Sequence, residues 1–213
     1  MKTIHFLLVT FLFISISVAS KAQSEQYIAA MKTNVQKLNT WTDAPQNLAA
    51  TFERIAQAEQ SQWLPYYYAS YATLIQTYSL KTTEEKDKLI EHAQNLLDKA
   101  FSLNPDMSEL TALQGFLYIT YLSSEPNGRG AEYSVKANEA FDKAVAMNAQ
   151  NPRALYLKGI TVLNTPDFFG GGKKPAKPIL EKAVAAYNSY MPASEIYPSW
   201  GKDDCVKQLA ACE

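Results

Sequence analysis

The chain has 213 residues and a formal net charge of −1 at pH 7, and it carries no basic tail. Such a weak charge does not attract nucleic acid, which argues against a polyanion partner. The length suits one sizeable core or a short array of repeats, so we expect a single domain after the N-terminal leader.

The N-terminus has the features of a secretory signal peptide. Lys2 is followed by an apolar stretch over residues 4–18 and by small residues up to Ala22. This pattern predicts cleavage after Ala22, and the stretch is shorter than the ~20 residues that span a bilayer. No cysteine stands near the cleavage point, so a lipid anchor is not expected. Residues 1–22 are thus predicted to be the leader, and residues 23–213 an exported, soluble domain, periplasmic or secreted, without a membrane span.

Helical spacing of apolar residues runs through the rest of the chain. Residues from Tyr27 to Leu38 define the first helix, and Thr82 with Glu85 predicts a capping box that opens the fourth. The expected helices cover residues 24–39, 43–59, 62–79, 83–102, 107–122, 131–147, 152–164, 174–190 and 199–211. Enlarged turns are expected at 125–130 and 165–173, and no strand is expected because no segment alternates with period two.

An internal repeat organises these helices. Ala93 and Ala137, for example, are 44 residues apart. Three columns share this spacing, two of alanine and one of tyrosine or glycine: Ala49, Ala93 and Ala137; Ala56, Ala100 and Ala144; Tyr71, Gly115 and Gly159. Fixed periods of this order indicate stacked supersecondary units.

The sequence pattern of the repeat is similar to that of a known family. Residues 96–105 read LLDKAFSLNP, residues 140–148 read AFDKAVAMN, and each segment is followed by a helix that carries a glycine. This pattern resembles the tetratricopeptide repeat, of the type found in exported bacterial proteins. The resemblance implies an all-α fold, a right-handed superhelix of about four antiparallel helix pairs closed by a C-terminal capping helix.

The repeat is longer than the ~34 residues typical of that family. The excess lies between the glycine of the first helix of a pair and the first alanine of the second helix, as between Gly115 and Ala137. Longer helices or enlarged turns must absorb it at one edge of the array. Such insertions often form the binding face.

Two glycine-rich connections at this edge are candidate binding loops. They contribute the basic and glycine residues Arg129, Gly170, Gly171, Gly172, Lys173 and Lys174. Backbone N–H groups before a helix bind anions, so one hypothesis is that this edge binds an acidic peptide or a small anion. The alternative is that the glycines only reverse the chain while Phe168 or Phe169 packs under the repeats.

The resemblance also implies a concave groove lined by the first helix of each pair. Carried over by register, its lining is mostly apolar: Tyr68, Ile75, Phe116, Ile119, Tyr156, Ile160 and Leu163. The groove then either accepts an apolar segment or is filled by the chain's own terminal helices. Of the tyrosines at 66–71, most are expected in the core, and only Tyr68 is a candidate for an aromatic platform.

Signals for catalysis and for metal binding are weak. His92 is the only histidine after the leader, without a second ligand at metal spacing, so no metal, cofactor or catalytic residue is predicted. Cys205 and Cys212 either form a local disulfide or remain thiols.

These observations favour a non-catalytic binding or scaffold protein of the cell envelope, with a protein or peptide partner in the groove or at the loops. The alternative is a small-molecule binder with a pocket between helices, comparable to repeat components associated with solute transport. A third possibility is a self-associating structural protein. An enclosed apolar cavity beside the first helices of the pairs favours the small molecule, and an open groove favours the protein partner.

Overall fold

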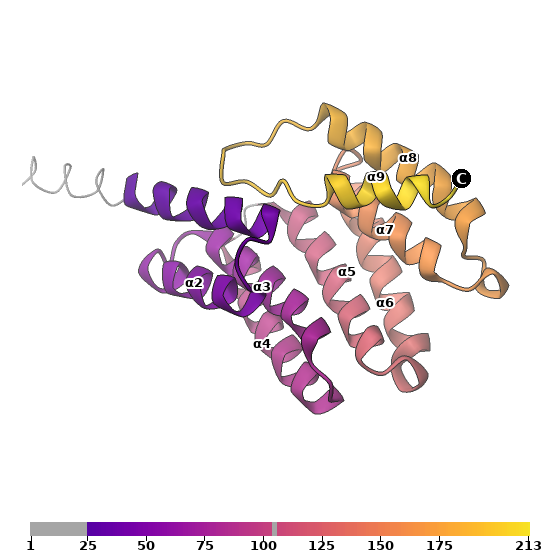
Figure 1. Cartoon of the computed structure of the whole chain (residues 1–213), viewed down its shortest axis with the longest axis horizontal. Coiled ribbons are helices and arrows are strands. Elements are labelled where there is room, and N and C mark those ends of the chain that lie inside the picture. The colour runs from indigo at the N-terminus through magenta and orange to yellow at the C-terminus, as the bar shows by residue number, and fades with distance from the viewer. Residues whose placement is uncertain (1–24, 104–105) are drawn as a thin grey trace, which may run out of the picture.

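The computed structural model describes residues 25–103 and 106–213, and every regular element among them is helical (Figure 1). The predicted leader lies outside these residues. The elements are a first helix over residues 25–40, α2 (Pro45–Ala58), α3 (Trp63–Gln76) with the 3-10 turn η1 (Thr77–Ser79), α4 (Thr83–Ser102), α5 (Met107–Ser124), α6 (Pro126–Met147), α7 (Pro152–Asn164), the 3-10 turn η2 (Asp167–Phe169), α8 (Lys173–Ser189) and α9 (Lys202–Ala210). The expected all-α fold is confirmed.

Capping residues close in sequence define where several helices begin. The capping box of α4 is present, because the Thr82 side chain accepts a hydrogen bond from the Glu85 backbone N–H and the Glu85 carboxylate accepts one from the Thr82 backbone N–H. Asp106 caps α5 and Asn151 caps α7 through side-chain oxygens. These starts depend on residues close together in sequence, which is why the sequence predicts them.

Successive helices pack as pairs. α3 lies against α4, α5 against α6 and α7 against α8, while α5 also contacts both α3 and α7. The glycine column marks the crossing within a pair: a Cβ at Gly115 would lie 2.3 Å from the Phe141 ring, and one at Gly159 would lie 2.7 Å from Leu180. Small residues at these positions let the two helices approach closely.

One predicted turn is wrong. Residues 127–130 were expected in a loop, but α6 begins at Pro126, so they form the first turns of that helix. Proline is well suited to the first helical position. Arg129 further fixes this turn by pairing with Glu125, one helical turn before it. Longer helices therefore absorb the extra residues here, whereas a true turn remains between α7 and α8.

The C-terminal segment returns across the molecule. After α8 the chain runs toward the first helix and turns back into α9 (Figure 1). Lys32 pairs with Glu195 at 2.8 Å, the Asn39 amide donates to the Ser199 hydroxyl at 2.9 Å, and Tyr68 donates to the Ile196 carbonyl at 3.0 Å. α9 then packs on α7 and α8. No helix of the described part is both long and apolar enough to cross a membrane.

Candidate ligand-binding pocket

The main cavity among the described residues lies between α3, α5, α7 and α9. Its volume is about 740 Å³, within the range of small-molecule sites. Its apolar and aromatic lining is Trp41, Tyr71, Ile75, Tyr78, Phe116, Ile119, Leu122, Tyr156, Leu157, Ile160 and Trp200. The first helices of three pairs and the returning C-terminal segment thus share one concave, mostly apolar site.

Tyr71 is the centre of the aromatic wall. Its ring stacks on Trp200, with centroids 4.4 Å apart and planes at 13°. Phe116 and Trp41 lie 5.9 Å and 6.2 Å from it at tilted angles. Burial raises the pKa of Tyr71, so its hydroxyl is neutral at pH 7. These ring contacts make one wall of the pocket aromatic and apolar.

The charged part of the lining comes from α9. Lys202, Asp203, Asp204 and Lys207 are all exposed, and the only close pair among them joins Lys207 to Asp204 at 3.5 Å. Burial and the nearby Asp204 carboxylate raise the pKa of Tyr156 above its ordinary value. The pocket therefore combines a neutral aromatic interior with charged groups on one helix. Among its lining residues in the described part there is no histidine, methionine or cysteine.

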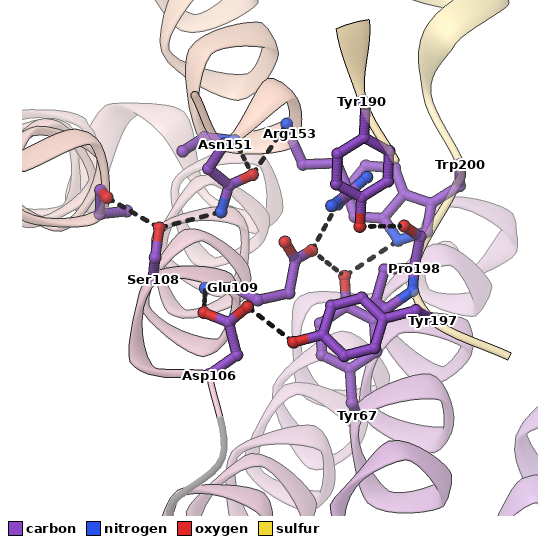
Figure 2. A network of polar contacts seen from close by, with 12 residues as sticks. Tyr67, Asp106, Ser108, Glu109, Asn151, Arg153, Tyr190, Tyr197, Pro198 and Trp200 are labelled. Carbon is purple, nitrogen blue, oxygen red and sulfur yellow. Dashed lines mark hydrogen bonds and ion pairs between the residues drawn. The ribbon is translucent and has the colours of Figure 1, made fainter. Parts of the chain in front are cut away.

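A polar network that includes the pocket residue Trp200 fixes the C-terminal segment (Figure 2). The Trp200 indole donates to the Tyr67 hydroxyl at 3.0 Å, and Tyr67 donates to Glu109 at 2.8 Å. Arg153 donates to the same carboxylate oxygen at 2.5 Å.

Two further tyrosines belong to this network. Tyr197 donates to Asp106 at 2.7 Å, and Tyr190 donates to the Pro198 carbonyl at 3.0 Å (Figure 2). Helices α3, α5 and α7 are thereby linked to the segment that carries Trp200. These bonds tie Trp200, and with it the aromatic wall, to the three helices, while Nη1 of Arg153 is buried without a hydrogen-bond partner among the described residues.

Comparison with known proteins defines the family. No family model matches the chain, and no curated protein matches it. A solved structure, described as the HusA haemophore from Porphyromonas gingivalis, matches it at 33% sequence identity with a TM-score of 0.80. The match covers 88% of this chain and 92% of that one. The chain belongs to the family of this haemophore.

The predicted groove residues can now be placed in the haemophore-family fold. Ile75, Phe116, Ile119, Tyr156 and Ile160 line the pocket.

Two other groove residues lie elsewhere. Tyr68 is fully buried and stacks on Phe52, with ring centroids 5.0 Å apart. Leu163 is half-buried on α7 but outside the pocket lining. Tyr71, three residues after Tyr68, is the tyrosine that lines the pocket instead.

The repeat pattern does not predict the parts of the pocket wall that come from outside the repeat helices. Trp41 follows the first helix, and Trp200 precedes α9. Neither belongs to a repeat column, so register gives no reason to place them at the pocket. One feature of the sequence does point to the C-terminal part of this wall. The last helix is half polar, as expected for a helix with one side on a solvated pocket.

Arg129 has carboxylate partners. Its guanidinium contacts both oxygens of Asp87, at 2.5 Å and 2.7 Å, and lies 3.3 Å from Glu125. The hydrogen bond from Arg129 lowers the pKa of Asp87. This residue therefore stabilises the junction of α4 and α6 and offers no unpaired charge to an anion.

The second candidate loop keeps its turn, but its phenylalanines do not pack inside. Phe168 is 90% exposed and Phe169 is 74% exposed, so the expectation that one of them packs under the repeats is wrong. Gly170, Gly171 and Gly172 form the turn itself, and Lys173 and Lys174 begin α8 as exposed residues.

The other reactive side chains have ordinary partners. His92 lies 2.9 Å from Glu53, and no group of residues able to hold a metal is found in the described part. Cys205 and Cys212 are buried free thiols, and burial raises the pKa of Cys205 to about 12. Cys205 is therefore a protonated packing residue at neutral pH.

Proposed function

We propose that this protein is an exported carrier that binds haem or a related porphyrin in the pocket. One observation carries the proposal: a relative named as a haemophore shares the fold at 33% identity, and this chain has a large aromatic pocket in that fold. The predicted leader supports export. A binding role rather than a catalytic one agrees with the class of the named relative.

The chemistry of the pocket suits a porphyrin. A porphyrin is a flat macrocycle with apolar faces and, in haem, carboxylates along one edge. The aromatic lining, which includes Tyr71, Phe116 and Trp200, offers apolar contacts to such a ring. Of the charged residues on α9, Lys202 supplies positive charge for the carboxylates, whereas Lys207 already pairs with Asp204.

Binding in this pocket rests on the ring rather than on the iron. The strong haem ligands in proteins are histidine, cysteine and methionine, and none lines the described pocket. Tyrosine is the remaining candidate, and Tyr71, Tyr78 and Tyr156 line the pocket. Burial raises the pKa of all three, so their hydroxyls are neutral and thus weak ligands. We expect metal-free protoporphyrin to bind with an affinity within about tenfold of that of haem, a difference of ~1.4 kcal/mol.

The test is a spectroscopic titration of the chain with haem and with protoporphyrin. Ile160→Trp fills the pocket from α7 and should weaken both ligands at least about tenfold. Leu163→Trp is the matched control, since it adds the same ring on the same helix outside the lining, and should bind as the wild type does. Equal loss in both variants, or no spectral change with either porphyrin, would show that the pocket is not the site.

A small ligand is favoured over a peptide because the C-terminal segment already occupies part of the concave side. Ser199 to Asp204 line the pocket, so the groove is narrowed to a cavity. An extended peptide needs an open channel along the helices. Membership of the tetratricopeptide family, implied by the repeat pattern, stays a prediction.

A further inference from the structure

The turn between α7 and α8 exposes two adjacent aromatic rings. Phe168 and Phe169 are 90% and 74% exposed, and their rings contact each other edge to face with centroids 5.2 Å apart. A Cβ at Gly170, the next residue, would meet no atom within 4 Å. The two rings therefore form an apolar tip that projects into solvent, which folded proteins avoid unless the surface has a partner.

This tip is held rigidly. The Gly171 and Gly172 backbone N–H groups donate to the carbonyls of Pro166 and Val162 at 3.2 Å and 2.9 Å. A Cβ at Gly171 would lie 2.1 Å from the Thr165 carbonyl oxygen, so only glycine allows this close approach. The backbone is fixed in a form that keeps both rings outside, and exposure of the phenylalanines is built into the turn.

Positive charge lies directly beside the tip. Lys173, Lys174 and Lys177 occupy the first turns of α8, and none of their side chains has an ion-pair or hydrogen-bond partner in the described part of the chain. The one acid of the turn, Asp167, is directed back toward Gly172, where its carboxylate would clash with an added Cβ at 2.0 Å. The surface next to the rings is thus cationic.

We infer that the turn 165–172, together with these lysines, docks the protein on an anionic lipid surface, with Phe168 and Phe169 inserted at the boundary of headgroups and acyl chains. Interfacial anchors combine aromatic rings with basic residues that attract anionic lipids. A protein partner is less well suited. Two phenylalanines contribute roughly 150–250 Å² each, and a stable protein interface needs about 1,000 Å² in total.

The docking turn lies next to the pocket. Asn164 and Thr165 line the pocket, and the turn begins at Thr165, directly after α7 ends. A docked molecule therefore holds one edge of its pocket near the lipid surface. Lipid docking goes beyond porphyrin binding and does not depend on it, because neither the two phenylalanines nor the three lysines line the pocket.

Vesicle co-sedimentation tests the inference. The chain without residues 1–22 is suitable, since the described core runs from Tyr27 to Cys212 and the apolar leader would bind lipid by itself. We expect it to bind vesicles of equal parts phosphatidylcholine and phosphatidylglycerol, and to bind phosphatidylcholine alone at least about tenfold more weakly. Added salt should weaken the binding.

Three variants assign the binding to the turn. Phe168→Ser/Phe169→Ser should reduce binding at least about tenfold, and Lys173→Glu/Lys174→Glu should remove the preference for anionic lipid. Met191→Ser, which changes another residue that is 87% exposed, is the matched control and should bind as the wild type does. All four side chains of the test variants are exposed, so the melting temperature should not change.

Several results would overturn the inference. Wild-type protein that stays in the supernatant with both kinds of vesicle is one such result, and a double phenylalanine variant that binds as well as the wild type is another. Binding to intact envelopes that protease treatment abolishes, without vesicle binding, would assign the tip to a protein receptor instead. Porphyrin titrations of the same variants without lipid report separately on the pocket, so the two proposals fail independently.

Discussion

The ion pair of Glu109 and Arg153 is the most buried charged contact of the described chain. Their side chains are 2% and 1% exposed. Burial lowers the pKa of Arg153, but the Glu109 carboxylate more than offsets this, so the guanidinium stays charged. Arg153 also lies over the Tyr190 ring at 4.5 Å, a cation–π contact with the C-terminal segment. The pair therefore organises the polar network that includes Trp200.

Removing one partner of this pair should be costly. Arg153→Met leaves the Glu109 carboxylate buried without a counter-charge and should lower the free energy of unfolding by about 3–5 kcal/mol. Adding Glu109→Gln removes the remaining charge and keeps an oxygen for the Tyr67 hydroxyl, so the double variant should regain part of that loss. Urea denaturation of both variants measures this. A double variant no more stable than Arg153→Met would mean that lost packing, not the unpaired charge, causes the effect.

At the scale of elements, the helix pairs depend on close crossings. Gly115 on α5 lies where a Cβ would enter the Phe141 ring of α6. Gly130, by contrast, lies within α6 with no atom within 4 Å of an added Cβ. The same substitution therefore has opposite expected effects at the two sites.

We expect Gly115→Ala to lower the free energy of unfolding by about 1–3 kcal/mol, because the methyl group overpacks the crossing. Gly130→Ala should raise it by about 0.5–1 kcal/mol, because alanine restricts the unfolded chain and favours the helix. Chemical denaturation of the two variants provides the comparison. Stabilisation by both would show that α5 and α6 separate readily enough to accept the methyl group.

At the scale of the whole molecule, the C-terminal return joins distant parts of the fold. Trp200 stacks on Tyr71 of α3 and donates to Tyr67, while the following helix packs on α7 and α8. One residue thus contributes both to the core and to the wall of the pocket. Stability and ligand binding are expected to depend on it together.

Trp200→Ala should lower the free energy of unfolding by about 3–5 kcal/mol and weaken porphyrin binding, because it empties a core site and removes half of the stacked wall. Val206→Ala on α9 is the control: its side chain is 46% exposed and should have little effect on either property. Denaturation and titration of the same samples check both parts. If a folded Trp200→Ala variant bound porphyrin with the affinity of the wild type, the ligand would lie away from this wall.

Much of the fold could be predicted because its signals are local. The Thr82 capping box, the prolines at helix starts and the glycine column each act within a helix or between sequential helices. The lining of the pocket by Phe116, Ile119 and Ile160 follows in the same way, since register along one helix fixes which residues share a face. The turn at 127–130 was mispredicted because glycine suggested a loop, whereas Pro126 and the pairing of Arg129 favour helix.

What the sequence by itself determined is therefore the helices, their pairing and the apolar side that the repeat helices share. Only the tertiary structure decided what closes that side into a pocket, because Trp41, Tyr71 and Trp200 meet through contacts between residues far apart in the chain. It also decided that Phe168 and Phe169 face solvent. Backbone hydrogen bonds across the turn fix the direction of these two side chains. The amino-acid composition of the turn gives no information about that direction.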